Sequence, residues 1–199
     1  MIKEIIGYTT AITALPKVDS GPNTNGHEYV DLGLPSGTLW ATMNVGANTE
    51  TDYGNYYKYG MGAKTYDSTD TAYTGTEDPL DLSRDTARQV WGGEWHTPTA
   101  EQFRELLANT TYEWVTNYLN SGIEGIVFTA NGNNLFMPAR GEDAEGNSGN
   151  YYWTNQPNKD GYCHYFGFNN NNTLYVNIDA FSYYAGGRRR GFSIRPVIG

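Results

Sequence analysis

From residue 27 onward the chain consists of short apolar stretches that glycine and proline interrupt. In the run HEYVDLGLPSGTLWATMNVGA, Gly33, the Pro35–Gly37 tripeptide and Gly46 separate stretches of only a few apolar residues. Because glycine and proline favour turns, this pattern predicts short strands joined by tight turns, with little helix. The composition fits an ordered domain and not a disordered chain, since 24 glycines and 17 tyrosines accompany only 18% charged residues.

Length, cysteine content and charge exclude several classes of protein. A chain of 199 residues can bury a core without disulfides or metals. Cys163 is the only cysteine, so no disulfide can form within the chain. The formal net charge of −9 repels phosphate backbones, and we expect no nucleic-acid partner. No apolar run approaches the length of a membrane span, and the stretch after Met1 is too short for a signal peptide, so we expect no membrane insertion.

Residues 1–26 differ from the rest of the chain. The segment from Ile5 to Leu15 is rich in residues that favour strands, and the segment from Ser20 to Gly26 has the composition of a linker. Two interpretations stay open. The strand lies at the edge of the domain, or it attaches the protein to copies of itself or to a larger assembly. We therefore divide the chain into an N-terminal strand and linker, 1–26, and a main domain, 27–199.

Two helices are predicted in the middle of the chain. The first runs from Leu82 to Trp91, with Ser83 as N-cap and Gly92 as the stop. The second runs from Pro98 to Leu107, with Thr97 as N-cap and an apolar face.

The second half of the chain contains short strand candidates. These are Gly125–Phe128, Asn134–Pro138, Tyr151–Thr154, Cys163–Phe168, Leu174–Ile178 and Phe192–Val197. Helices early and strands late in the chain predict the α+β class.

Six motifs in order carry a family resemblance. They are HEYVDLGLPSGTLWATMNVGA, DYGNYYKYG, DTARQVWGGEWHTPTAEQFRELL, GNNLFMPARG, YYWTNQP and GFSIRPV. Over roughly residues 27–198 the chain resembles the Bacteroidetes-type major paralogous domain. This domain is a branch of the C-type-lectin fold related to the formylglycine-generating enzymes. The resemblance implies a C-type-lectin-like α+β domain with two helices and a twisted antiparallel sheet, and a recognition role at a cell surface or in a phage. The first 26 residues lie outside the match.

This fold also includes the variable proteins of diversity-generating retroelements, in which adenines of template codons such as AAC are replaced. A diversified AAC codon cannot encode Lys, Glu, Gln, Met or Trp. Residues 1–159 contain 28 residues of these five types, and residues 160–199 contain none. At the earlier frequency the last 40 residues would hold about seven. We interpret the C-terminal segment as diversified, and the alternative is a glycine- and asparagine-rich β-region that lacks these residues for other reasons.

Alternation along the two C-terminal strand candidates predicts which side chains face the ligand. Phe166, Phe168, Leu174, Val176 and Ile178 would face the core, and the residues between them would face outward. Tyrosine with small polar residues is the composition of antibody loops, because tyrosine supplies stiff amphipathic contact area. The alternative is an ordinary exposed sheet with solvated tyrosines. The predicted ligand-binding residues are Tyr162, His164, Tyr165, Gly167, Asn169, Asn170, Tyr175, Asn177, Asp179, Ser182, Tyr183, Tyr184 and Arg188.

Catalytic and metal-binding patterns are weak. His27, His96 and His164 have no metal-ligand spacing, and we expect a structural role for His96. The formylglycine-generating enzymes use paired cysteines, which Cys163 alone cannot supply. We therefore expect no catalytic residues and no cofactor.

Two charged clusters have competing interpretations. The acidic residues at 67, 70, 77, 78, 81 and 85 match no EF-hand spacing, so a solvated loop is favoured over a calcium site, and we expect no metal. The run Arg188–Arg190 either anchors its loop by pairing with carboxylates or adds charge to the binding face.

The sequence thus predicts a binding protein and not an enzyme. Its expected partner is a protein or carbohydrate on a cell surface, and its expected location is a cell surface or a phage virion. The alternative is a structural or assembly subunit of a phage tail or bacterial surface appendage. The presence of a reverse-transcriptase gene beside a near-repeat of the final coding segment would favour the first interpretation.

Overall fold

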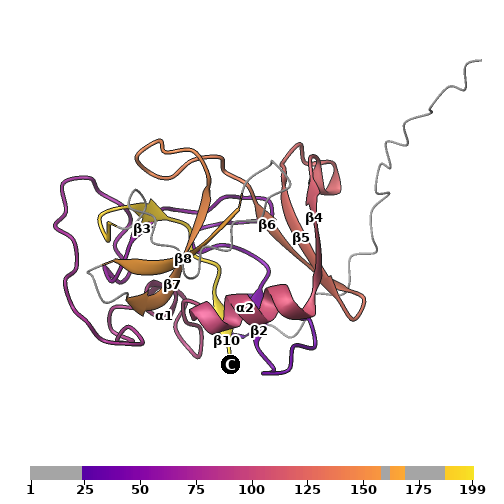
Figure 1. Ribbon diagram of the computed structural model, residues 1–199, viewed down its shortest axis with the longest axis horizontal. Helices are drawn as coiled ribbons and strands as arrows, with labels where there is room; N and C mark the ends of the chain where they lie inside the picture. The colour runs from indigo at the N-terminus through magenta and orange to yellow at the C-terminus, as the bar shows by residue number, and fades with distance from the viewer. Residues whose placement is uncertain (1–23, 158–161, 169–186) are drawn as a thin grey trace, which may run out of the picture.

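The computed structural model describes residues 24–157, 162–168 and 187–199 (Figure 1). In chain order the elements are β1 (Tyr29–Asp31), β2 (Leu39–Ala41), β3 (Tyr57–Lys58), α1 (Thr86–Trp91), α2 (Ala100–Asn109), β4 (Thr111–Val115), the 3-10 turn η1 (Tyr118–Asn120), β5 (Gly125–Ala130), β6 (Asn133–Pro138), β7 (Asn150–Pro157), β8 (Cys163–Phe168), β9 (Gly191–Phe192) and β10 (Val197–Ile198). Within these ranges no helix is long and apolar enough to cross a bilayer.

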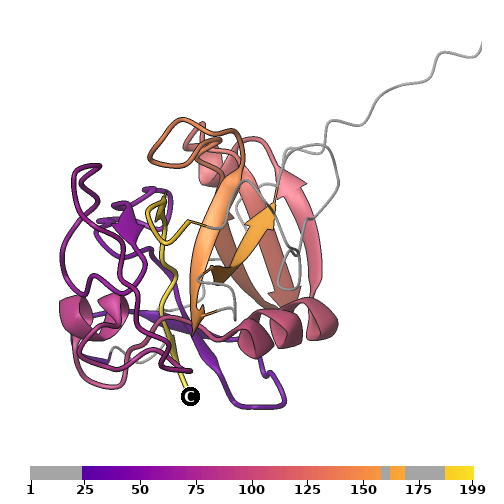
Figure 2. The same ribbon diagram turned by 60° about the vertical axis from the view of Figure 1, so that its left-hand side comes forward.

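The described strands form several small antiparallel sheets and not one continuous sheet. Their orders are β1-β2-β10, β3-β9, β4-β5-β6 and β7-β8. Figure 2 shows α2 beneath the strands of the second half of the chain, while α1 lies apart beside the loops of the first half. Two α-helices with separate antiparallel sheets confirm the α+β class.

Helix α1 is shorter than the sequence predicts. It begins at Thr86 with Asp85 as its N-cap, whose carboxylate accepts a hydrogen bond from the Arg88 amide. Ser83 is not the cap, because its amide and hydroxyl both donate to Asp81 in a preceding turn. The predicted stop is confirmed, since the helix ends at Gly92 with a φ of 69°, a conformation that glycine adopts readily.

Helix α2 begins at Ala100, two residues later than predicted. Thr97 is not its cap, because its amide and hydroxyl already donate to the buried Asp85 carboxylate. Thr99 caps the helix instead, in a capping box in which Thr99 and Gln102 exchange hydrogen bonds. The predicted apolar face is confirmed, with Phe103 and Leu106 fully buried.

The strand predictions are largely confirmed. Strands β5 to β8 contain the four predicted stretches between residues 125 and 168. The predicted strand Phe192–Val197 is divided between β9 and β10. Between these two strands, the carbonyls of Ile194 and Pro196 accept hydrogen bonds from Val45 and Ala41 of the first half of the chain. The candidate Leu174–Ile178 lies outside the described residues.

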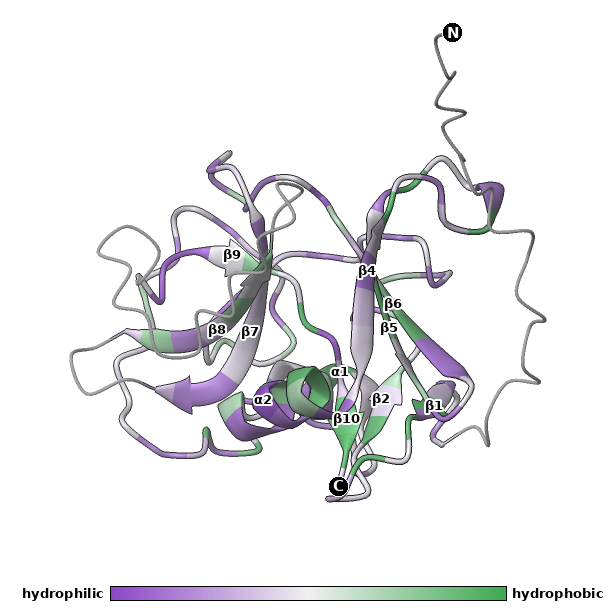
Figure 3. Cartoon of the chain, turned by 45° about the vertical axis from the view of Figure 1, so that its right-hand side comes forward, coloured by the Kyte–Doolittle hydropathy of each residue, from purple (hydrophilic) through white to green (hydrophobic). Residues whose placement is uncertain are grey.

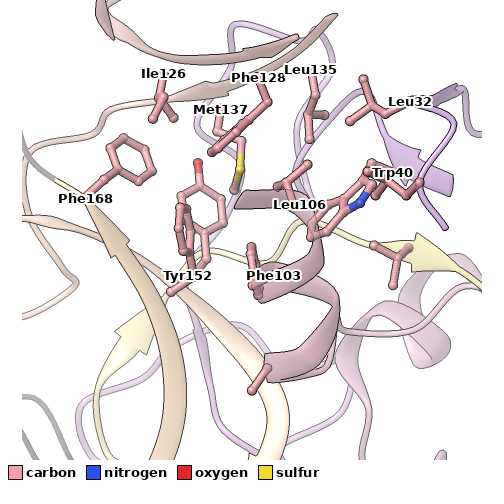
Figure 4. Close-up of a cluster of buried hydrophobic side chains, with 14 of the residues drawn as sticks. Leu32, Trp40, Phe103, Leu106, Ile126, Phe128, Leu135, Met137, Tyr152 and Phe168 are labelled. Atoms are coloured by element: carbon pink, nitrogen blue, oxygen red, sulfur yellow. The ribbon is translucent and has the colours of Figure 1, made fainter. Parts of the chain in front are cut away.

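The larger core cluster lies between α2, the β4-β5-β6 sheet and one face of the β7-β8 hairpin (Figure 4). Phe103 of α2 stacks on Phe166 of β8, with ring centroids 4.6 Å apart. Tyr152 of β7 stacks on Phe168, and Trp114 of β4 meets the same ring edge-on. Burial of such rings supplies most of the stabilisation of a domain of this size.

The second core cluster covers the opposite face of the same hairpin. Trp153 of β7 packs on Phe192 of β9, with centroids 4.2 Å apart, and its indole N–H donates to the Tyr57 carbonyl of β3. Tyr165 of β8 lies against Phe192 and Tyr151. The β7-β8 hairpin is therefore buried between two clusters, as a central layer.

The first described residues are docked on α1. The ring of His27 stacks on Trp91, with centroids 3.7 Å apart and nearly parallel planes. The Trp95 indole donates to the Thr24 carbonyl, and the Asn25 amide donates to the Trp91 carbonyl. Burial lowers the pKa of His27. The predicted strand at Ile5–Leu15 lies outside the described residues.

We expect Phe166→Ala to destabilise the protein by about 3–5 kcal/mol, because its ring contacts both α2 and the β5 strand. The control is Leu82→Ala, a side chain that is 53% exposed, which should change the free energy of unfolding by less than about 0.5 kcal/mol. Urea denaturation followed by tryptophan fluorescence measures both values. Equal midpoints for the two variants would contradict the packing described here.

Candidate functional site

Strand β8 contains three of the predicted binding residues, His164, Tyr165 and Gly167, and the prediction is wrong for two of them. Phe166 and Phe168 are buried in the larger cluster, as predicted. Tyr165 is only 4% exposed and lies in the second cluster, so the prediction that it faces solvent is wrong. The reason is that β9 returns over this face and brings Phe192 against the Tyr165 ring.

Gly167 is also buried and does not form part of an outer surface. Its strand partner is Tyr151, and a Cβ atom added at Gly167 would lie 3.4 Å from the Tyr151 ring and 3.3 Å from the Asn150 carbonyl oxygen. A larger residue here would push against β7. This position therefore belongs to the core of the hairpin.

Arg188 is buried too, and it anchors a loop instead of facing a ligand. It is 4% exposed, and its guanidinium donates to the carbonyls of Tyr73 and Gly75 and lies over the Tyr59 ring. The predicted pairing of this basic run with carboxylates holds for Arg190, whose Nη1 lies 2.8 Å from Asp143 Oδ2. These contacts fix the chain immediately after residue 186.

Two predicted contact residues remain at least partly exposed among the described residues. Tyr162 and His164 are both half-buried, at the start of β8. The other predicted residues lie outside the described ranges: Asn169, Asn170, Tyr175, Asn177, Asp179, Ser182, Tyr183 and Tyr184. Two buried residues, Phe168 and Arg188, lie on either side of these positions in the chain.

Cys163 is buried at the start of β8, beside Tyr59 and Arg188. Burial raises the pKa of its thiol to about 12, although Arg188 and Tyr59 act in the opposite direction. The thiolate is the reactive form of cysteine, and at neutral pH this side chain is almost entirely protonated.

The histidine and acidic candidates have structural contacts. Both ring nitrogens of His96 face backbone carbonyl oxygens, those of Thr97 and Gly199, at 3.0 and 3.1 Å. Asp85 accepts hydrogen bonds from Arg88 and Thr97, although burial raises its pKa.

The remaining acidic residues of the predicted cluster lie in the loop between β3 and α1. Asp67 and Asp81 each accept hydrogen bonds within a turn, Asp70 pairs with Lys64, and Glu77 accepts from Tyr73. Across the described ranges, no three acidic, histidine or cysteine side chains are grouped in a way that could hold a metal ion.

The structure reveals a buried polar centre that the sequence did not mark. Arg195 of the GFSIRPV motif is fully buried, as are Asn44 and Tyr152, and Arg140 lies nearby. In the predicted strand Phe192–Val197, a charged residue is expected at an exposed position. An arginine flanked by Ile194 and Pro196 in an otherwise apolar run was the available signal.

Comparison of the chain with protein-family models, with curated proteins and with solved structures gave no match.

We expect Tyr165→Ser to behave as a core substitution. Loss of the ring removes contacts with Tyr151 and Phe192, and should cost about 3 kcal/mol of stability. The matched control is Tyr112→Ser on β4, whose side chain is 48% exposed and should cost under about 1 kcal/mol. Thermal and urea unfolding of both variants measure the difference. If Tyr165→Ser loses no more stability than the control, Tyr165 faces solvent, as the sequence predicted.

Cys163 should resist thiol reagents in the folded protein. Because its pKa is raised to about 12, the thiolate is scarce at neutral pH, and burial blocks access. Labelling with a disulfide reagent at about pH 8 should be slow in buffer and rapid after denaturation in urea. Labelling of the folded protein at the rate of free cysteine would contradict this placement.

Proposed function

We propose that the chain is a ligand-binding protein with a C-type-lectin-like fold and a retroelement-diversified C-terminal segment. The observation that carries the proposal is the absence of Lys, Glu, Gln, Met and Trp from residues 160–199, against 28 such residues in 1–159. The family resemblance of residues 27–198 and the α+β class, with two α-helices and antiparallel sheets among the described residues, support the same interpretation.

The packing on either side of residues 169–186 supports a division between a fixed frame and a variable surface. Phe168 is buried between Trp114 and Tyr152 before the interval, and Arg188 is buried beside Tyr59 after it. Substitution of such side chains is costly, because a buried ring or guanidinium cannot be replaced without leaving a cavity or unpaired groups. Diversification within 160–199 is therefore proposed to act mainly between these two anchors.

The contact set that we propose is narrower than the one predicted from sequence. It omits Tyr165, Gly167 and Arg188, which are buried. It keeps Tyr162 and His164, together with the predicted residues between 169 and 184. The partner class is a protein or carbohydrate of a cell surface, recognised by tyrosine side chains with adaptable small polar neighbours.

The test is a triple variant in which Tyr175, Tyr183 and Tyr184 are each changed to Ser. We expect its binding to a panel of bacterial cells and to a glycan array to weaken at least about tenfold, because central aromatic contacts carry much of a binding free energy. Its melting temperature should stay close to that of the parent.

The control is Tyr112→Ser, an exposed aromatic residue outside the diversified segment, which should leave binding unchanged. Full binding by the triple variant would place recognition elsewhere on the domain. Unfolding of the triple variant would show that these tyrosines belong to the core. Sequencing of the genomic locus adds an independent check, since the proposal requires a reverse-transcriptase gene and a near-repeat of the final coding segment.

A further inference from the structure

Strand β4 has an open edge within the described part of the structure. It is the terminal strand of the β4-β5-β6 sheet, and no strand or isolated bridge among the described residues pairs with its outer side (Figure 2). The opposite edge of this sheet is covered, because Asn131 and Asn133, just before β6 and at its start, donate to the carbonyls of Leu32 and Asp31 beside β1. A row of unpaired backbone groups is a ready template for another strand.

The backbone groups at this edge belong to Tyr112 and Trp114. In an antiparallel ladder, alternate residues direct both N–H and C=O toward the same neighbouring strand. The Ala139 amide donates to the Glu124 carbonyl in line with the β5-β6 register, so the even-numbered residues of β5 bond to β6 and the odd-numbered ones to β4. The β4 partners of these odd-numbered residues are Thr111, Glu113 and Val115. The N–H and C=O groups of Tyr112 and Trp114 therefore point away from the sheet.

The sequence of β4 lacks the devices that usually prevent strand addition. Its five residues, TYEWV, include no proline and no lysine, and only Glu113 is charged. Its register with β5 is unbroken over all five residues, without a bulge. Natural proteins use proline, lysine and bulges to protect such edges. The edge of β4 is therefore regular enough to pair with another strand.

Exposed apolar surface lies beside this edge. Tyr112 and Trp114 share the face of β4 whose rings meet Phe128 and Phe168. Tyr112 is nevertheless 48% exposed, and Leu119 of η1, which follows β4, is 46% exposed. Side chains on one face of neighbouring strands pack together, so a strand added beside β4 would cover the outer part of the Tyr112 ring.

The chain itself carries a segment with the properties that this edge requires. The segment from Ile5 to Leu15 contains eleven residues without a charge, and isoleucine, threonine and tyrosine favour strands. Its even-numbered positions include Ile6, Tyr8 and Ile12, which would share one face of a strand. This face is apolar, as is the face of β4 that carries Tyr112 and Trp114.

The contacts of Thr24 and His27 fix the place where this segment leaves the domain. The Trp95 indole donates to the Thr24 carbonyl, and His27 stacks on Trp91 of α1. Both tryptophans belong to the second core cluster, whereas Trp114 of β4 packs on the larger one. Figure 1 shows α1 and β4 on different sides of the domain. The segment therefore starts far from the β4 edge of its own chain, and this arrangement favours an edge supplied by another copy.

We propose that residues 5–15 of one copy add as a strand to the β4 edge of a second copy. The backbone groups of Tyr112 and Trp114 pair with the added strand, and its even-numbered side chains lie on the face of these two residues. The contact joins two different surfaces, and each copy carries both of them. Association therefore continues head to tail.

The first test measures self-association of the full chain by sedimentation velocity over a range of concentrations. Tyr112→Pro removes an outward N–H and leaves the hydrogen bonds to β5 in place, because proline is tolerated on edge strands. We expect this variant to associate at least about tenfold more weakly than the parent. The matched control Tyr112→Ser also removes the ring but keeps the N–H, and should weaken association less. A parent that stays monomeric at every concentration, or equal association of the two variants, would overturn the proposal.

The second test changes the added strand and leaves the described domain untouched, so it does not depend on the folding of Tyr112→Pro. Lysine at both Ile6 and Ile12 places charges on the apolar face, and should weaken association at least about tenfold. The matched control places lysine at both Thr9 and Thr13, on the opposite face, and adds the same charge. Equal effects of the two double variants would contradict the proposed strand.

The third test distinguishes a second copy from the same chain. Thr9→Cys and Glu113→Cys are prepared as separate variants and mixed with a short bismaleimide crosslinker. Cys163 is buried and burial raises its pKa to about 12, so it reacts slowly. We expect crosslinked dimers in the mixture and few in either variant alone. A chain that carries both substitutions and forms only an internal crosslink at every concentration would show that the segment folds back on its own β4, and would overturn addition to a second copy.

Discussion

Burial of the β7-β8 hairpin on both faces is the constraint on which the rest of this structure depends. The side chains of Tyr152, Phe166 and Phe168 lie in the larger core cluster, with α2 and the β4-β5-β6 sheet. The side chains of Trp153 and Tyr165 lie in the second core cluster, with β3 and β9. Two-sided burial requires both halves of the chain to pack around one hairpin. Figure 3 shows the hairpin between strand β9 and helix α2, with β4, β5 and β6 to one side.

This central layer also determines where variation is tolerable in the proposed function. Strand β8 leads into the interval 169–186 from a buried phenylalanine, and β9 follows it after a buried arginine. Under the proposed function, variation is concentrated between these two packed flanks, and the buried side chains at the flanks stay constant. The low tolerance of a close-packed interior to changes in volume is the physical reason for such a division.

The buried polar groups hold together the loops that surround the aromatic layers. The Asp85 carboxylate joins the start of α1 to Thr97 ahead of α2, and Arg188 joins the chain before β9 to the loop that contains Tyr73. Arg195 is a third such group, since its Nη1 donates to the Ala41 carbonyl of β2.

The sequence by itself determined the α+β class, strands β5 to β8, the Gly92 stop of α1 and the apolar face of α2. These features follow from local patterns of glycine, proline and apolar spacing, which act within a few residues. Only the tertiary structure decided the caps of the two helices, because the buried Asp85 takes Thr97 as a hydrogen-bond donor and leaves Thr99 to cap α2. Only the tertiary structure decided the burial of Tyr165, Gly167 and Arg188 as well. Alternation along a strand states which residues share a face, but distant segments such as β9 determine whether that face meets water.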